Sequence, residues 1–361
     1  MKDNQSLLLR NKKILVICAS GIGNTILFTP TLETLRKEIK VKITLFVTKQ
    51  EFAEPISGSR LVDEIMVFDN DKNLFEKIKN IIKLRREKFD YSITAFPSNR
   101  WQFNIFAFLV GAKKRITHSY KVGKLRTLSF LQDVKVPAKE RLHDVEQNLN
   151  LLRALNINPK RKKRELLFYV NSEDKEFANE WLKKNKISKK NFLVGIHPGC
   201  KKSTRYRRWP KENFVKIINN LIKRKKKMLL FAGPDEIEEV IWMYNQYKEK
   251  DRVFLIREKG LKHAAALIAK CRMFICTDSG LGHIATALRV PTLAIFGPAQ
   301  ASRTRPYGKY GHYISSNLPR SSCLKYPFQS TSSKIKCKKN FKYLTNIKVE
   351  GVMRRINKIL R

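Results

Sequence analysis

Short apolar runs alternate with longer amphipathic segments along most of the chain. In the first half, this pattern predicts strands at 14–18, 42–47 and 91–95 and helices at 29–39, 73–88 and 145–155. In the second half, it predicts strands near Phe192, Met228, Val253, Met273 and Thr292, and helices that begin near Trp209, Asp235, Leu261 and Gly282. Such alternation is typical of parallel sheets covered by helices. We therefore expect an α/β protein with two Rossmann-like domains.

The boundary between these domains is expected at a polar, charged stretch from Asn156 to Lys160. A chain of 361 residues exceeds what one hydrophobic core usually holds, so two domains are the natural prediction. We assign residues 1–158 to the N-terminal domain and residues 164–361 to the C-terminal domain. The last helix is expected to pack back on the first domain.

Hydropathy argues against a membrane-spanning helix. No apolar run reaches the roughly 18 residues that a span requires, and the longest lies near 103–112. The N-terminal apolar segment, Leu7 to Leu9, is too short for a secretory signal. We therefore expect the protein to stay in the cytoplasm.

The formal net charge of +44 is the most unusual feature of the composition. One explanation is compositional bias, because Lys, Ile and Asn are abundant throughout the chain. A second is attraction to an anionic bilayer surface, where each nearby Lys or Arg contributes about 1 kcal/mol. The segments richest in cations are 160–164, 223–227 and 334–361. Nucleic acid is a weaker third explanation, because we find no zinc-finger, RNA-binding or helix-turn-helix signature.

A strand, turn and helix from Met273 to Phe296 carry the first candidate site. The apolar strand ends in the turn Asp278-Ser279-Gly280-Leu281-Gly282-His283, whose small and polar residues suit the start of a helix. Unpaired N–H groups at a helix start can bind a phosphate. The alternative is an ordinary helix cap made by Asp278 or Ser279.

A second turn of the same kind follows the apolar run from Phe192 to Ile196. It begins with His197-Pro198-Gly199 and continues to Trp209-Pro210, with six cations and no acid between Lys201 and Lys211. The carboxyl ends of parallel strands share one edge of a sheet, which is where ligands bind in such folds. Two phosphate-binding turns at that edge indicate a diphosphate ligand.

Further motifs occur in order along the rest of the chain. They are Gly21-Ile22-Gly23-Asn24 with Thr29-Pro30, His143-Asp144-Val145-Glu146, Ala232-Gly233-Pro234 with Glu236, Phe296-Gly297-Pro298, and Pro306-Tyr307-Gly308. With the two turns, this set resembles glycosyltransferase family 9, the heptosyltransferases that build the inner core of bacterial lipopolysaccharide. The resemblance extends over nearly the whole chain.

The resemblance implies a GT-B fold, with two Rossmann-like domains that face an interdomain cleft. It also implies an inverting transfer of a sugar, with ADP-heptose as the expected donor, to a lipopolysaccharide-core or other anionic glycolipid acceptor. The N-terminal domain would bind the acceptor and the C-terminal domain the nucleotide-sugar. No cofactor is expected, because the family does not depend on a metal.

The resemblance also assigns roles to residues of the C-terminal domain. Ser203 and Arg207 would contact the phosphates, with Arg207 at a position where the family usually has Lys. Ser279 and Gly280 would contact the phosphates from the other turn. Asp278 would hold sugar hydroxyls, and Glu236 would accept a hydrogen bond from the ribose. His283 completes the donor set, although a structural role in the first helical turn suits it better than that of an acid.

Asn24 is where the chain departs from the family pattern. The family has an aspartate after the Gly-x-Gly turn as catalytic base, and an amide cannot take a proton at neutral pH. Another group serves as base, or the acceptor chemistry differs, or catalysis is weak. A nucleotide-sugar-binding or scaffold protein without catalysis is therefore the main alternative function.

Four residues of the first domain are candidates for binding the acceptor: Gly23, Asn99, Arg100 and His118. Basic residues from Lys113 to Arg126 lie near them, and a solvated loop is the alternative reading of that run. No metal site is predicted. The six cysteines form no C-x-x-C pair, and Asp69-Asn70-Asp71 resembles a D-x-D metal motif only superficially.

Overall fold

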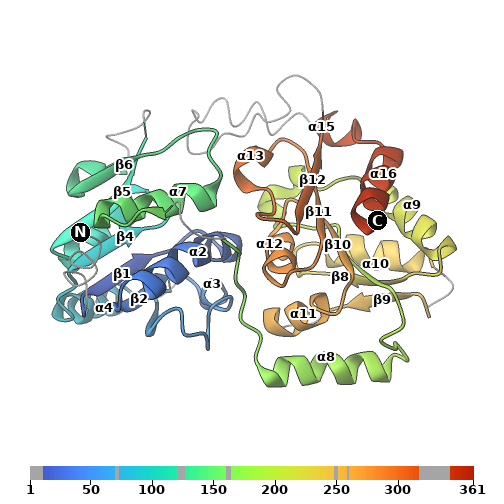
Figure 1. The fold of residues 1–361 in the computed structure, drawn as a ribbon, viewed down its shortest axis with the longest axis horizontal. Coiled ribbons are helices and arrows are strands. Elements are labelled where there is room, and N and C mark those ends of the chain that lie inside the picture. Colours follow the sequence, from blue (N-terminus) through green and yellow to red (C-terminus); the bar gives the residue numbers. More distant parts are fainter. Residues whose placement is uncertain are drawn as a thin grey trace. The chain divides into compact units, whose positions relative to one another are not determined.

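The structure is a computed structural model, and it describes residues 11–69, 73–120, 127–159, 164–247, 251–257, 260–316 and 342–361. The described part divides into two compact units, Met1–Tyr169 and Val170–Arg361 (Figure 1). Most of the segment 160–164, the Asp69-Asn70-Asp71 motif beyond Asp69, the basic run 121–126, Cys323, Cys337 and residues 334–341 of the C-terminal cation segment lie outside the described residues.

The first unit is built on a six-stranded parallel sheet. Its strands are β1 (Lys13–Ile17), β2 (Lys42–Val47), β3 (Glu64–Val67), β4 (Tyr91–Thr94), β5 (Lys114–Ser119) and β6 (Val134–Pro137). Their spatial order is β3-β2-β1-β4-β5-β6, and the pairs are all parallel. This is the strand order of a Rossmann fold. Strands β2 and β3 lie on one side of β1, and the later strands β4, β5 and β6 lie on its other side.

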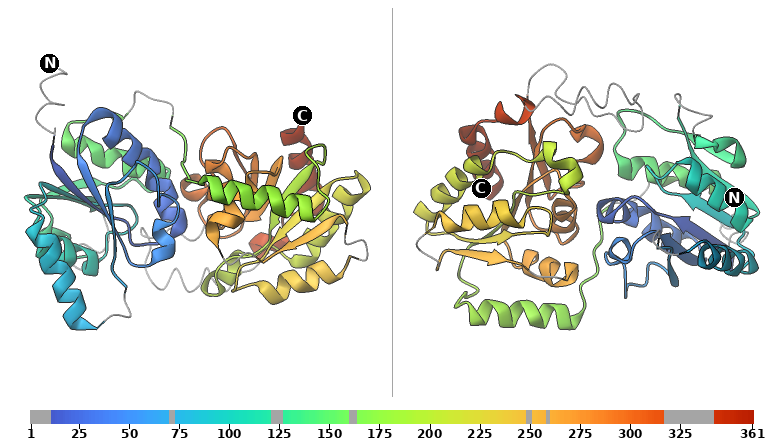
Figure 2. Two further views of the ribbon diagram at one scale, coloured as in Figure 1. Left: turned by 90° about the horizontal axis from the view of Figure 1, so that it is seen from below. Right: turned by 180° about the vertical axis from the view of Figure 1, so that it is seen from behind.

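Helices cover both faces of this sheet (Figure 2). The α-helices of the unit are α2 (Ile22–Glu38), α3 (Gln50–Ala53), α4 (Leu74–Arg86), α5 (Trp101–Val110) and α7 (Asp144–Asn150), and the short 3-10 helices are η1 (Ser129–Leu131) and η2 (Leu151–Leu155). Helix α2 contacts α7, while α4 contacts α5. Phe106, Ala107 and Val110 of α5 pack with Leu15, Ile17 and Phe46 of the sheet in one hydrophobic cluster.

The second unit repeats the same topology. Its strands are β7 (Leu193–His197), β8 (Lys227–Phe231), β9 (Val253–Ile256), β10 (Met273–Thr277), β11 (Thr292–Phe296) and β12 (Gly311–Ser315). Their order is β12-β11-β10-β7-β8-β9, again with parallel pairs. Strands β8 and β9 therefore lie on one side of β7, and the later strands β10, β11 and β12 lie on its other side. The predicted α/β fold with two Rossmann-like domains is confirmed.

The helices of the second unit also lie on both faces of its sheet (Figure 2). They are α8 (Ser172–Lys184), η4 (Lys202–Arg207), α9 (Lys211–Lys223), α10 (Ile237–Asn245), α11 (Leu261–Ile268), α12 (Gly280–Ala287), α13 (Ala301–Thr304), α15 (Lys342–Thr345) and α16 (Val349–Leu360). Trp209 and Phe214 lie in the same core cluster as the buried residues of β7, β8 and β10.

The first unit ends at Tyr169, eleven residues after the predicted end of the first domain at residue 158. Residues 165–169 stay with the first unit, because Leu167 N donates to Thr29 Oγ1 at 2.9 Å and Tyr169 N donates to Pro55 O at 2.8 Å. These hydrogen bonds hold the segment after the polar stretch against the first unit, and the sequence pattern does not reveal them.

The last helix, α16, packs within the second unit. Val352, Met353 and Ile356 of α16 are buried in the core of that unit, and the helix contacts α9. Arg224 Nη1 also donates to Asn357 Oδ1 at 2.6 Å. Its apolar face is therefore used by the domain that contains it.

Among the described residues, no helix combines the length and the apolar character needed to cross a bilayer.

Candidate functional site in the second unit

Two neighbouring strand ends form the centre of the candidate site. His197 is the last residue of β7, and it lies opposite Cys276 in the parallel pairing with β10. The turn Asp278-Ser279 follows β10 directly. Both turns predicted from the sequence therefore lie at the carboxyl ends of the neighbouring strands β7 and β10. This is the topological switch point of the sheet, where ligands usually bind in such folds.

A chain of hydrogen bonds joins the two turns through His197. Its Nδ1 lies 3.0 Å from Ser279 Oγ, and its Nε2 lies 2.8 Å from Glu236 Oε1. Glu236 Oε1 also accepts from Gly233 N at 3.0 Å. His197 and Glu236 are only 5% and 6% exposed. The carboxylate therefore fixes the ring, and the ring contacts the hydroxyl at the start of α12.

The charge of Glu236 is maintained by its neighbours. Burial raises the pKa of Glu236, but the hydrogen bond from His197 and nearby positive charge lower it by more, so the pKa lies below its usual value. Arg208 Nη2 is 3.8 Å from Glu236 Oε2. Glu236 is therefore an ionised, buried carboxylate that only accepts hydrogen bonds.

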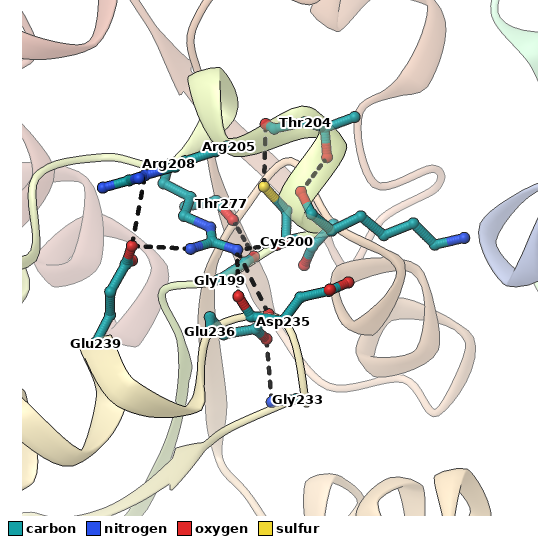
Figure 3. Close-up of polar contacts among 12 residues, drawn as sticks. Gly199, Cys200, Thr204, Arg205, Arg208, Gly233, Asp235, Glu236, Glu239 and Thr277 are labelled. Atoms are coloured by element: carbon teal, nitrogen blue, oxygen red, sulfur yellow. Dashed lines mark hydrogen bonds and ion pairs between the residues drawn. The ribbon is translucent and has the colours of Figure 1, made fainter.

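Arg208 joins the turn after β7 to the start of α10 (Figure 3). Its guanidinium donates to Glu239 Oε1 at 2.9 Å and to Asp235 O at 3.0 Å, and it also donates to the carbonyl of Cys200. Arg208 is therefore held by the protein itself, with a planar group that matches several acceptors at once.

Arg207 points to the other turn. Its Nη1 forms an ion pair with Asp278 Oδ2 at 3.0 Å, and its side chain is about one third exposed. Its Nε is buried and, among the described residues, has no hydrogen-bond acceptor. Buried donors are nearly always paired, and this one lies beside the turn after β10.

The start of α12 is not closed by a side chain. Ser279 is the N-cap residue, but its side chain makes no capping hydrogen bond, since it contacts His197 instead. The helix begins at Gly280, two residues before the predicted start. A Cβ at Gly282 would lie 2.7 Å from Cys276 Sγ, so glycine is what allows the helix to approach β10 so closely. The capping alternative for Ser279 is therefore excluded in this structure.

Gly199 performs a similar task beside Glu236. A Cβ at this position would overlap Glu236 Cγ and Cδ. The glycine of His197-Pro198-Gly199 thus leaves the space in which the carboxylate reaches His197.

The remaining predicted donor residues occupy different environments. Ser203 is exposed in η4. His283 is 7% exposed in the first turn of α12, and its Nδ1 is buried without a hydrogen-bond partner among the described residues. Burial lowers the pKa of His283 to about 4, so its ring is neutral at pH 7. A neutral, buried ring fits the structural role predicted for it.

In the first unit, Asn24 lies in a helix and not in a loop. Helix α2 begins at Ile22, seven residues before the predicted start, after Gly21 with φ of 121°. Asn24 Nδ2 donates to Ser20 O at 2.8 Å, and Asn24 is partly buried, like its neighbour Gly23. The β-branched and proline residues near Thr29 hid this start, because they are poor interior helix formers.

Asn99 and His118, predicted from the sequence as acceptor-binding residues, are both buried in the first unit. Asn99 is 3% exposed and donates to the carbonyl of His118, while His118 is fully buried with Nδ1 3.1 Å from Val136 O. Their hydrogen bonds connect β5 to its neighbours in the first unit. Arg100, by contrast, is exposed at the N-cap of α5.

Among the described residues, no group of three or more His, Cys, Asp or Glu side chains is arranged to hold a metal ion.

The sequence profile of glycosyltransferase family 9 (heptosyltransferase) matches residues 78–333. The chain belongs to glycosyltransferase family 9. It is therefore a glycosyltransferase, as its motifs predicted.

Similar proteins and structures agree with this assignment to family 9. The lipopolysaccharide heptosyltransferase 3 of Escherichia coli (strain K12) is 24% identical over 352 residues, which cover 94% of this chain and 95% of that protein. A family 9 glycosyltransferase from Veillonella parvula has a TM-score of 0.81 at 22% identity, covering 97% of each chain. The E. coli ADP-heptose lps heptosyltransferase II has a TM-score of 0.74 at 20% identity, covering 96% of this chain and 98% of that one. These structures confirm the predicted GT-B fold class.

Two residues of this family 9 site were missed in the sequence. His197 and Arg208 stood inside recognised motifs but received no role of their own. The signal for His197 is its place as the last residue of a buried strand, where a polar side chain needs a partner. That partner, Glu236, is 39 residues away, and only the fold brings it near.

Proposed function

We propose that this family 9 enzyme transfers a sugar, with inversion, from a nucleotide-diphosphate donor to a lipopolysaccharide-core or other glycolipid acceptor. The observation that carries the proposal is the meeting of two turns at one sheet edge. The contacts Arg207–Asp278 and His197–Ser279, both 3.0 Å, bring cationic and hydroxyl groups together at that edge.

ADP-heptose is the first donor to test. The E. coli structure with the same fold is described as an ADP-heptose lps heptosyltransferase, and the relative that matches nearly the whole chain is a lipopolysaccharide heptosyltransferase. The diphosphate of such a donor carries the negative charge that the two turns suit.

The leaving diphosphate gains negative charge as the bond to the sugar breaks. Arg207 and the N–H groups of the first turn of α12, which begins at Gly280, can stabilise that charge. Ser203, exposed in η4, can donate to a phosphate oxygen from the other turn. Asp278 then remains available as an acceptor for sugar hydroxyls when a phosphate competes for Arg207.

Glu236 is better suited to position His197 than to bind the ribose, the role first expected of it. The Glu236 carboxylate can only accept hydrogen bonds. The proton in this bond is therefore on His197 Nε2, which donates to Glu236 Oε1. In the neutral ring, Nδ1 then accepts the hydroxyl proton of Ser279.

Asn24 would orient the acceptor in the first unit. Its amide nitrogen is committed to Ser20 O, which leaves the amide oxygen as an acceptor for a sugar hydroxyl. Gly23 and the exposed Arg100 complete the acceptor set that we propose. None of the three is a general base at neutral pH.

The amide at Asn24 favours a second candidate function. A protein that binds nucleotide-sugars but catalyses transfer weakly or not at all would need the complete donor site and no base. Such a protein would bind the donor without turnover. Nucleic acid is not a proposed partner.

Acceptor-dependent release of the nucleotide distinguishes the two functions. We expect ADP release from ADP-heptose only when a glycolipid extract that lacks the terminal sugar is present. Donor binding without any acceptor-dependent release, in extracts from several truncated cores, would favour the second function.

We also propose that the enzyme works at the cytoplasmic face of the inner membrane, where a glycolipid acceptor is embedded. The formal charge of +44 supports this location through attraction to anionic lipids.

A further inference from the structure

Helix α4 exposes a stripe of large apolar side chains. Phe75, Ile78 and Ile82 are 76%, 47% and 46% exposed, and their spacing of three and four residues places them on one face. Another face of the same helix packs inward through Ile81 and Leu84. The exposed stripe is therefore separate from the face of α4 that packs in the core of the first unit.

The neighbouring helix α5 exposes three more. Trp101, Phe108 and Leu109 are 50%, 46% and 41% exposed, and α5 packs against α4. Arg85 Nη1 on α4 donates to Leu109 O at 3.1 Å, which joins the two helices near their ends. Six of the ten large apolar side chains that are exposed in the described chain lie on these two helices, so the exposed apolar surface is concentrated there.

Cations lie on the same face of α4. Lys79 follows Phe75 by four residues and Arg86 follows Ile82 by four, so each cation lies next to an exposed apolar side chain. Lys79, Lys83 and Arg86 are exposed. The helix has five cations and one acid in 13 residues. We call the six apolar residues, together with these three cations, the α4–α5 face.

We propose that the α4–α5 face docks on the surface of an anionic lipid bilayer. Apolar side chains enter the acyl boundary of a bilayer, while long basic side chains reach its phosphates, and tryptophan favours the boundary itself. A second copy of the chain fits less well, because a symmetric contact would place the cations of α4 against one another. Helix α4 lies on the outside of the first unit in both views of Figure 2, where it is light blue.

The basic run at 223–227, first expected to contact the membrane, is less available. Arg224 donates to Asn357 Oδ1, and Lys226 Nζ lies 4.1 Å from the centre of the Phe192 ring. Lys227 Nζ donates to Lys186 O at 3.4 Å. These cations are therefore partly used within the second unit, and no exposed apolar stripe accompanies them among the described residues.

The test is sedimentation of the full chain with phosphatidylcholine vesicles, with and without phosphatidylglycerol. We expect binding only when the anionic lipid is present. The variant Phe75→Ser/Ile78→Ser/Ile82→Ser should partition about 100-fold less, because three apolar side chains no longer enter the bilayer. The matched control Lys223→Ser/Lys225→Ser/Lys226→Ser should bind nearly as well as the unaltered chain.

Two results would overturn this proposal. One is vesicle binding by the α4 variant that equals that of the unaltered chain. The other is an α4 variant that changes self-association in ultracentrifugation while vesicle binding is unchanged, which would make the face a contact between copies. Donor binding in solution serves as the independent readout, because the α4 variant should retain it whether or not the proposed transferase function is correct.

Discussion

At the scale of single residues, Asn24 is the position at which we expect catalysis to be limited. Its amide donates to Ser20 O, a bond that a carboxylate cannot make. The identity of this residue was plain in the sequence, but its commitment to a carbonyl four residues earlier became visible only when α2 was found to begin at Ile22.

The Asn24→Asp variant should therefore lose the hydrogen bond to Ser20 O and gain a carboxylate that can act as a general base. The new carboxylate would turn away from Ser20 O, at a cost of about 1 kcal/mol in the free energy of unfolding. If the rest of the site is complete, the acceptor-dependent kcat should rise at least tenfold, towards the roughly 10²-fold that a general base supplies. The measurement is nucleotide release at saturating donor and acceptor.

Asn24→Ala is the control for that experiment, because it removes the amide without adding a base. It should leave kcat unchanged or lower it. A faster Asn24→Ala enzyme, or an unaltered enzyme that outperforms both variants, would show that the missing carboxylate does not limit the rate.

At the scale of elements, the turns after β7 and β10 depend on close approaches that glycine permits. Gly199 leaves space for Glu236, and Gly282 lets α12 approach Cys276. The strands and most helices could be predicted from periodicity, because their burial repeats along the chain. The starts of α2 and α12 could not, since both are set by local glycine conformation and packing.

Gly199→Ala tests the link between Glu236 and His197. The added methyl would displace the Glu236 carboxylate, so His197 would no longer hold the hydroxyl of Ser279. We expect donor affinity to fall about tenfold, roughly the loss of one hydrogen bond to a charged group, with the secondary structure intact by circular dichroism.

Gly351→Ala provides a matched control in helix α16. The nearest atom to its added Cβ is Ile314 Cδ1 at 3.7 Å, an ordinary contact. This change should leave donor affinity unaltered and stabilise the protein by about 0.5–1 kcal/mol, because alanine is the better helix former. Equal donor affinity in both glycine variants would contradict the role given to Gly199.

At the scale of the whole molecule, the repeated fold follows from the sequence more securely than the site does. Two sheets with the same strand order arise from buried strands that alternate with helices. Contacts between residues far apart in the sequence were not predictable. Such contacts bury Asn99 and His118 in the first unit and pack α16 into the core of the second unit.

Buried histidine also makes stability depend on pH. Burial lowers the pKa of His118 to about 4, below the ordinary value near 6.5 that applies in the unfolded chain. Between these values the unfolded state binds more protons, so stability falls as the pH is lowered from 6.5 to 4, by about 3 kcal/mol from this residue.

His118→Gln should make that dependence shallower. Denaturant unfolding of the first unit, followed from pH 7 to pH 4.5, gives the change in the free energy of unfolding with pH. The slope should decrease relative to the unaltered protein, whatever the substitution costs at pH 7. An identical slope would mean that His118 is not held neutral by burial.

We propose that the turns after β7 and β10 bind the diphosphate of a nucleotide-sugar. Calorimetric titration with ADP-heptose tests it most directly, using the unaltered protein, Arg207→Met and Arg207→Lys. We predict one binding site, an affinity 10- to 100-fold lower in Arg207→Met, and partial retention in Arg207→Lys, which keeps the charge but loses the planar fork. Binding of Arg207→Met as tight as that of the unaltered protein, or no binding of any nucleotide-diphosphate sugar, would contradict the claim.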